Sequence, residues 1–481
     1  MLFNSLGFAL FLPAVFGLYW WLGNRTNGIR WQNLLLILSG YFFYGLWDWR
    51  FLILLFTATA VDYWVGLKIG QYKDRSAPGW VLAISVVMNI GMLGTFKYFD
   101  FFSSSLTDLL ALFGMKASLP MLHIILPVGI SFYTFQTLSY TIDCWRGRMQ
   151  PTRDPIAFFA FVSFFPPLVA GPIERGHHLL PQMLAPRRFD RAHAVTGLRL
   201  MLWGFFKKIA IADALAPYVD HVYNGEHPIS GWEITIATLL FGIQIYCDFS
   251  GYTDIARGSA RLLGFELAIN FNRPYFSSSL QAFWTRWHIS LSSWFRDYLY
   301  IPLGGNRVGP TRQSLNILIV FLVSGLWHGA AATFVVWGAI HGLWYLLERW
   351  LKLDSRLPKA IGTALTLFIV MSAWLFFRAK TWDSAVHAIA AFGDWSSANG
   401  LFAGCDADFS LVWPIAWVLI YFAVLIAFLL GGEAMFDMAQ QRGRFASLPR
   451  GARWGFYYLL IIWILAFGAY GTPQQFIYFQ F

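Results

Sequence analysis

Apolar stretches of membrane length recur along almost the whole chain. They lie at residues 2–22, 32–47, 51–67, 79–98, 120–141, 195–215, 232–247, 313–328, 331–348, 361–377, 411–431 and 455–471. A helix needs about 20 residues to cross the hydrocarbon core of a bilayer, and fewer where the bilayer is thinned. Only 12% of the residues are charged, against about 25% in a soluble globular domain. The pattern predicts an all-α polytopic membrane protein with about 11 or 12 transmembrane helices.

The placement of lysine and arginine predicts the orientation of these spans. Cytoplasmic connectors of membrane proteins carry an excess of both residues. The basic connectors are 23–31, 68–78, 142–154, 255–312, 349–359 and 432–454. Assigning them to the cytoplasm lets the spans alternate, and both chain termini then lie on the outer side. These connectors also account for the net charge of +10, so no nucleic-acid partner is expected.

Two segments depart from a simple crossing. Residues 156–169 are apolar, but basic segments flank them and prolines interrupt them, which favours a re-entrant hairpin. Residues 283–300 interleave aromatic and charged side chains, which predicts an interfacial or cavity-lining amphipathic helix. We expect one membrane domain with four parts. They are the N-terminal helices (1–141), a central re-entrant, cytoplasmic and amphipathic region (142–312), a helical hairpin (313–348) and the C-terminal helices (349–481).

A histidine interrupts one of the apolar runs. His328 stands in the sequence SGLWHGAA, between the apolar residues 317–323 and the uncharged residues 332–340. An ionisable group at that depth is costly and marks a functional site by default. Histidine also titrates near physiological pH, as a general base or proton relay requires. The alternation of spans places His328 at a hairpin tip, at mid-depth or toward the outer face.

A second histidine lies in the amphipathic segment, at the predicted cytoplasmic boundary. His288 follows Trp287 directly, and arginines precede and follow the pair. Arg286, Arg296 and Arg307 would suit phosphate groups that arrive from the cytosol, whereas an interfacial aromatic and basic belt is the simpler alternative. His288 could then position a reacting thioester or assist proton transfer.

A third group of polar residues ends the apolar span at 232–247. Asp248, Ser250 and Tyr252 could orient a ligand or a histidine, or satisfy the backbone of a broken helix. The spans hold further ionisable groups without obvious opposite-charge pairing at mid-depth: His123, Lys207, Lys208, Asp213 and His341. The three cysteines are far apart, so we expect neither a disulfide framework nor a metal site.

Together these motifs resemble the membrane-bound O-acyltransferase family, in the bacterial branch that includes the membrane subunit for alginate O-acetylation. The residues that carry the resemblance are LPVGISFYTFQTLSYTID (126–143), FPPLVAGPIER (165–175), QIYCDFSGYTDIARG (244–258), FNRPYFS (271–277), FWTRWHISLSSWFRDYLYIPLGGNR (283–307), SGLWHGA (324–330) and FIYFQF (476–481). They cover almost the whole chain.

The resemblance implies a fold, a reaction and a location. The fold would be a ring of helices around a thinned centre with a funnel or tunnel, in the bacterial inner membrane with both termini periplasmic. The two family histidines map onto His328, the expected catalytic residue, and His288. Acetyl-CoA would donate its acetyl group from the cytoplasm without being a permanently bound cofactor. Asp248, Ser250, Tyr252, Trp287 and the three arginines would support donor binding.

The resemblance also implies where the acetyl group goes. It would leave on the outer face, to a periplasmic acetyltransferase of the SGNH type that modifies an exported, alginate-like polysaccharide. A similar aromatic terminus is needed on the outer side in related D-alanylation systems, so Tyr478, Phe479 and Phe481 would help to pass the acyl group on. An interfacial anchor is the other interpretation of this terminus.

Three alternatives stay open on the sequence. The first is a D-alanyl or lipid acyltransferase of the same family. The second is a transporter or channel, which predicts a continuous water-filled path and paired charges at mid-depth. The third is a scaffold subunit that only anchors a periplasmic enzyme, and it would tolerate the substitution His328→Ala.

Overall fold

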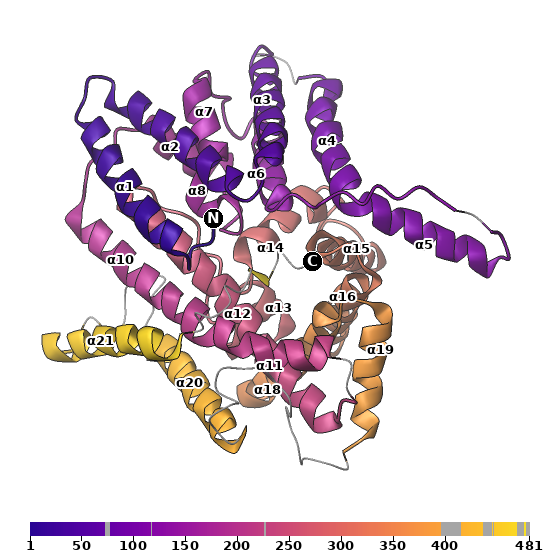
Figure 1. Ribbon diagram of the computed structural model, residues 1–481. Coiled ribbons are helices and arrows are strands. Elements are labelled where there is room, and N and C mark those ends of the chain that lie inside the picture. Colours follow the sequence, from indigo (N-terminus) through magenta and orange to yellow (C-terminus); the bar gives the residue numbers. More distant parts are fainter. Residues whose placement is uncertain are drawn as a thin grey trace. The chain divides into compact units, whose positions relative to one another are not determined.

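The computed structural model describes residues 1–72, 77–116, 118–225, 228–395, 415–435, 445, 447–468 and 476–477. Every regular element in this part of the chain is a helix, so the predicted all-α class is confirmed (Figure 1). The chain divides into two compact units. Unit 1 comprises Met1–Gly197 and Ala256–Ala268, and unit 2 comprises Leu198–Ile255 and Ile269–Phe481.

Unit 1 contains most of the N-terminal helices. They are α1 (Leu6–Gly23), α2 (Gly28–Gly45), η1 (Trp49–Phe51), α3 (Leu52–Ile69), α4 (Gly79–Leu93), η2 (Gly94–Tyr98), α5 (Phe99–Leu112), α6 (Ile130–Trp145), α7 (Pro155–Val162), α8 (Phe165–Leu168) and α9 (Gly176–Leu184). Local capping explains where some of them begin. The Ser5 side chain accepts a hydrogen bond from the backbone N–H of Phe8 at the start of α1. Asp154 caps α7 in the same way, with Pro155 at the first helical position.

Unit 2 contains the elements that carry the predicted site residues. They are η3 (Phe206–Ala212), α11 (Asp213–Asn224), η4 (Pro274–Phe276), α13 (Leu280–Trp284), α14 (Ile289–Phe295), η5 (Arg296–Tyr300), α15 (Pro310–His328), α16 (Ala332–Leu351), α17 (Leu353–Arg356), α18 (Lys359–Arg378), α19 (Trp382–Ala390), η6 (Ala391–Gly393), α20 (Ile415–Met435) and α21 (Arg450–Phe467). Two helices, α10 (Arg191–Phe205) and α12 (Gly231–Leu262), contribute residues to both units.

Five helical stretches in the described residues are long and apolar enough to cross a membrane. They are Leu6–Gly23, Trp49–Ile69, Gly79–Leu112, Gly231–Leu262 and Lys359–Arg378. The prediction for residues 120–141 is wrong in its first half, because helix α6 begins only at Ile130. Gly129 has a φ of 74°, and a Cβ there would lie 3.0 Å from the carbonyl oxygen of Leu168. Only glycine adopts this left-handed geometry easily, so the helix cannot begin earlier.

The predicted amphipathic helix at residues 283–300 is also wrong as one continuous element. The segment is divided into α13, a turn at residues 285–288, α14 and the π-helical η5. The break falls at His288, whose backbone is left-handed with a φ of 44° and a ψ of 53°. An L-residue rarely adopts this conformation, so tertiary contacts must maintain the break.

The expected interruption within residues 156–169 is present. α7 ends at Val162 and α8 begins at Phe165, with the proline pair inside α8. Nearly all side chains of this segment are buried in unit 1, as broken elements at membrane depth require. The return of this hairpin to the cytoplasmic side stays a prediction.

Candidate active site

Small residues bring α15 and α16 into close contact around His328. A Cβ on Gly325 would overlap the carbonyl oxygen of Phe334, and one on Gly329 would overlap the ring of Phe334. A Cβ on Gly338 would overlap the carbonyl oxygen of Phe321. The two helices lie side by side (Figure 1). The small residues before and after His328 therefore allow the close approach of α16.

His328 is the last residue of α15 and is only 3% exposed. Three aromatic rings surround its imidazole: Trp327 and Trp337, each with a centroid 5.0 Å away, and Phe377 at 5.3 Å. The carbonyl end of a helix carries partial negative charge. His328 therefore lies at the carbonyl end of α15, inside an aromatic enclosure.

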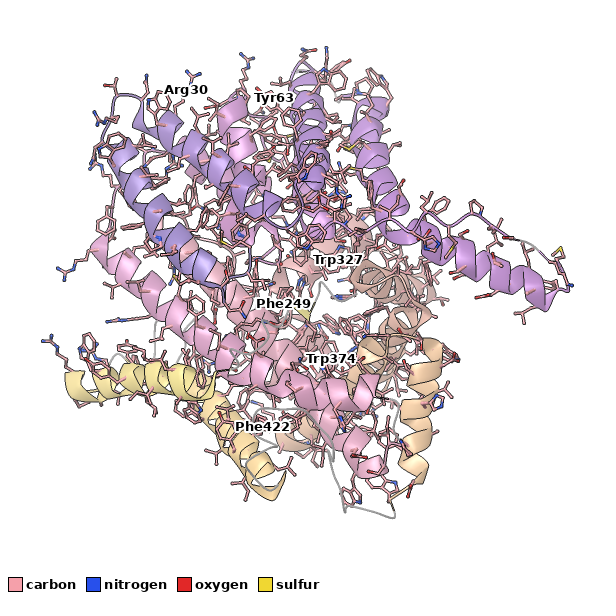
Figure 2. All side chains as sticks on the ribbon, viewed as in Figure 1. Arg30, Tyr63, Phe249, Trp327, Trp374 and Phe422 are labelled. Carbon is pink, nitrogen blue, oxygen red and sulfur yellow. The ribbon has the colours of Figure 1, made fainter. Side chains whose placement is uncertain are left out.

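His288 is fully buried and is the N-cap residue directly before α14. Its ring lies 4.7 Å from that of Phe249 on α12 and 5.7 Å from that of Trp327 on α15. Phe249 and Trp327 are labelled in Figure 2. The ring centroids of His288 and His328 are 6.3 Å apart. The two histidines that the sequence selected from distant segments thus share one buried site.

Asn270 stabilises the strained turn at His288, a role that the sequence did not predict. Its carbonyl oxygen accepts the N–H of Ile289 at 3.0 Å. Its side-chain oxygen accepts both the backbone N–H of Ser290 at 3.2 Å and the Ser290 hydroxyl at 2.9 Å. Backbone strain that is fixed by such contacts is typical of functional sites. No local pattern marks Asn270, because its partners lie 19 and 20 positions away.

The remaining residues of the predicted donor group occupy different surroundings. Trp287 is fully buried, with its ring 5.1 Å from that of Trp374. Arg286 is partly exposed, whereas Arg296 and Arg307 are exposed. Arg296 donates to its neighbour Asp297 at 2.8 Å. The contacts recorded for the described residues do not join the three guanidinium groups into one cluster.

Asp248 belongs to a buried ion network. The Nζ of Lys208 lies 2.7 Å from Asp213 and 2.8 Å from Asp248, and all three side chains are nearly inaccessible. Lys207 pairs with Asp254 beside them. The interpretation that these lysines lack opposite-charge partners is therefore wrong. Asp213 follows Lys208 by only five residues, but Asp248 and Asp254 come from the distant helix α12, so no short sequence pattern could show the whole network.

The end of the chain docks on this network. The backbone N–H of Ile477 donates to Asp248 at 2.7 Å. The ring of Phe476 lies 5.6 Å from that of Phe249 and 5.0 Å from that of Tyr252. Ser250 is buried on the same helix. Tyr478, Phe479 and Phe481 lie outside the described residues.

These features define a membrane enzyme with a buried histidine pair. The chain belongs to the membrane-bound O-acyltransferase family, whose family model matches residues 18–376. It is therefore an O-acyltransferase of the membrane.

Three similar proteins come from three bacteria. The chain is 43% identical over 413 residues to a protein named "Probable alginate O-acetylase AlgI" in Azotobacter vinelandii, covering 83% of this chain and 80% of the relative. It is 41% identical over 407 residues to the protein of that name in Pseudomonas aeruginosa, covering 82% and 76%. A peptidoglycan O-acetyltransferase of Helicobacter pylori is 35% identical over 421 residues, covering 81% and 79%.

Proposed function

We propose that this protein is an O-acetyltransferase that moves acetyl groups from cytoplasmic acetyl-CoA toward an exported, alginate-like polysaccharide. The observation that carries the proposal is the buried pair His288 and His328, with ring centroids 6.3 Å apart. The identity of more than 40% to the alginate O-acetylases named above supports acetyl as the group and a polysaccharide as the final acceptor.

The reaction needs one base and one route for a proton. The acceptor hydroxyl attacks the acetyl carbon of the thioester, a C–O bond forms, and the C–S bond breaks. His328 takes the hydroxyl proton, and the proton then returns to the leaving thiolate. The aromatic rings around His328 keep water from the reacting thioester. His288 stands on the side predicted to face the donor and assists the return of the proton.

The donor is proposed to approach from the cytoplasmic side. The segment that carries Arg286, Arg296 and Arg307 belongs to the basic connector 255–312, which the distribution of lysine and arginine assigns to the cytoplasm. Guanidinium groups there would attract the phosphates of the coenzyme. Asp297 partly neutralises Arg296, so Arg286 and Arg307 carry more of this role.

The last residues of the sequence are proposed to take part in transfer of the acetyl group on the outer side. Phe476 reaches the rings of Phe249 and Tyr252, and Phe249 in turn contacts His288. This connection supports a role for Tyr478, Phe479 and Phe481 in passing the acetyl group to a periplasmic partner of the SGNH type. We propose that both termini lie on the outer side, as the distribution of lysine and arginine favours, which in a bacterial inner membrane is the periplasm.

Reconstituted membranes test the proposal directly. Proteoliposomes receive radiolabelled acetyl-CoA on the cytoplasmic face and alginate oligosaccharides with periplasmic extract on the other. We expect His328→Ala and His288→Ala to lower transfer at least about 100-fold, the usual effect of losing a general base. The matched control is His387→Ala, because His387 is exposed on α19. Full transfer by a normally eluting His328→Ala protein would disprove the catalytic role, and offering peptidoglycan fragments instead of alginate tests the acceptor.

A further inference from the structure

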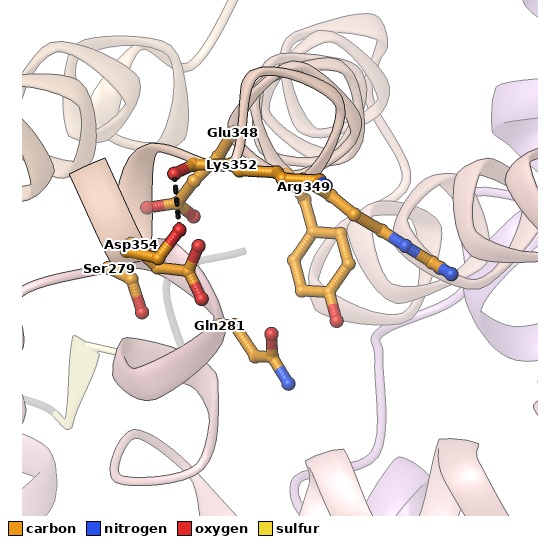
Figure 3. Close-up of a pocket in the computed structure, with 8 residues that line it drawn as sticks. Ser279, Gln281, Glu348, Arg349, Lys352 and Asp354 are labelled. Carbon is orange, nitrogen blue, oxygen red and sulfur yellow. Dashed lines mark hydrogen bonds between the residues drawn. The ribbon is translucent and has the colours of Figure 1, made fainter.

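A cavity of about 390 Å³ lies in unit 2 where α16 ends, and the proposed reaction does not use it (Figure 3). Its volume is in the range of small-molecule sites. Its walls come from the starts of α13 and α17 and from the last turns of α16. Every side chain that lines it carries a polar atom, and four of them are charged: Glu348, Arg349, Lys352 and Asp354. A cavity with walls of this kind favours a polar, charged ligand.

Glu348 is the buried charge of this cavity. Its side chain is only 7% exposed, and its carboxylate accepts the backbone N–H of Leu280 at 2.9 Å. None of the described lysines and arginines forms an ion pair with it. Asp354 adds a second negative charge that acts on Glu348. A buried charge without a paired cation is costly, so this carboxylate pair is expected to meet a positively charged group.

The same cavity also offers positive charge. Arg349 and Lys352 line it, and both residues are exposed. Arg349 donates to Gln313 at 2.7 Å, and a guanidinium group has five N–H donors, so most of them are available to a ligand. Figure 3 shows the carboxylates of Glu348 and Asp354 on one side of the view and the side chain of Arg349 extending to the other. A ligand that carries an ammonium group close to an anionic group matches both sets of charges.

The place of the cavity in the chain corresponds to the level of phospholipid headgroups. α16 ends at Leu351, inside the basic connector 349–359, which the distribution of lysine and arginine assigns to the cytoplasm. Trp350 in the last turn of α16 is 78% exposed, and exposed tryptophan is typical of the interface between membrane and water. This depth favours a lipid of the cytoplasmic leaflet over a dissolved amine as the ligand.

We propose that this cavity binds the headgroup of an ethanolamine phospholipid from the cytoplasmic leaflet. The ammonium group meets the carboxylates of Glu348 and Asp354, and the phosphate meets Arg349 and Lys352. Because Glu348 also accepts the N–H of Leu280 at the start of α13, the bound headgroup holds α17 and the end of α16 against α13. The site requires neither an acyl donor nor an acceptor, so it goes beyond the proposed function.

Three phospholipids with different headgroups test the proposal. Native mass spectrometry of the delipidated full chain measures the Kd for phosphatidylethanolamine, phosphatidylcholine and phosphatidylglycerol with equal acyl chains. We expect the first to bind about tenfold more tightly than the other two, the effect of a hydrogen bond to a charged group. The trimethylammonium of phosphatidylcholine donates no hydrogen bond, and phosphatidylglycerol has no ammonium group. Equal affinity for the three lipids would overturn the proposal.

A soluble competitor separates the two sources of the same chemistry. Free phosphoethanolamine carries the ammonium and the phosphate without the acyl chains. We expect an equal concentration of it to displace almost none of the bound phosphatidylethanolamine, because it gains nothing from the burial of acyl chains. Full displacement at equal concentration would assign the cavity to a dissolved amine and overturn the assignment to a lipid.

Matched variants connect the preference to this cavity. Glu348→Gln removes the charge but keeps an oxygen that can accept the N–H of Leu280, and Asp354→Asn removes the second charge. Each should reduce the preference for phosphatidylethanolamine over phosphatidylcholine to within about threefold. Asp383→Asn removes a charge at an exposed position of α19 and should keep the tenfold preference. An unchanged preference in both cavity variants, with melting temperatures like that of the wild type, would overturn the site.

Discussion

The imidazole rings of His288 and His328 lie 6.3 Å apart, although one belongs to a broken amphipathic segment and the other ends a long apolar helix. Different tertiary contacts hold each ring in place. His328 is held by the close packing of α15 on α16, and His288 by the left-handed turn that Asn270 stabilises. The geometry of the pair therefore depends on both the glycines of one segment and the strained backbone of the other.

Two substitutions of His288 distinguish the role of its left-handed backbone from the role of its imidazole. Asparagine adopts the left-handed conformation more readily than most residues, so His288→Asn should fold as stably as the wild type. It lacks a base, and acetyl transfer should fall at least about 100-fold. His288→Val should lower the melting temperature as well, since a β-branched residue is strained at this φ. Thermal unfolding in detergent together with the transfer assay checks both points, and an active His288→Asn protein would contradict the role of the imidazole.

The contact between α15 and α16 makes a second prediction. Gly325→Ala places a methyl group against the carbonyl oxygen of Phe334. Overpacking of this kind costs about 1–3 kcal/mol, and the end of α15 must shift with His328. We expect a lower melting temperature and reduced transfer. Gly309→Ala is the control, because a Cβ at Gly309 meets no atom within 4 Å, and it should change neither quantity.

His328 could be predicted because it interrupts an apolar run, and His288 because it stands beside tryptophan among arginines. An ionisable residue in an apolar run is visible without a structure, and so is the all-helical class. The break at His288 was not visible, since residues 285–288 contain neither glycine nor proline. Its cause is a hydrogen-bonded partner, Asn270, from another part of the chain.

The ion pairs of the charged residues in unit 2 also could not be predicted from the sequence. Lys207 and Lys208 are adjacent in the sequence and carry like charges, which gave no sign of pairing. In the structure they lie in a π-helical segment and meet Asp254, Asp213 and Asp248. Asp213 directly follows η3 in the chain, but Asp248 and Asp254 reach the lysines only through the packing of η3 against α12, which is a tertiary property.

In unit 1, the pair of His178 and Glu174 predicts a pH-dependent contribution to stability. The Nδ1 of His178 lies 2.7 Å from the Glu174 carboxylate, and this hydrogen bond raises the pKa of His178 above its ordinary value of 6.5. A group whose pKa is raised by folding adds to the free energy of unfolding. Its contribution is fully present below the pKa of the unfolded state and is lost as the pH rises through the pKa of the folded state. Because His178 is 41% exposed, the effect is small.

The measurement compares melting temperatures of the wild type and His178→Gln across pH 5.5 to 9, a range chosen around the ordinary histidine pKa. The wild type should be more stable at the acidic end, and the difference should shrink as the pH rises above about 6.5. His387→Gln should show no such trend, because the side chain of His387 is exposed on α19. A difference that grows with pH would contradict the assignment.

The contact of Ile477 with Asp248 tests whether the chain terminus takes part in transfer. Ile477→Pro removes the N–H that Asp248 accepts, whereas Ile477→Ala retains it. If the terminus passes the acetyl group on, Ile477→Pro should lower transfer to the polysaccharide by about tenfold or more, the effect of losing a hydrogen bond to a charged group. Ile477→Ala should stay within about threefold of the wild type, because it loses only side-chain packing at a terminus. Thiol release from acetyl-CoA measures the cytoplasmic half of the reaction. Equal transfer by the proline and alanine variants would mean that Asp248 and Ile477 only anchor the terminus.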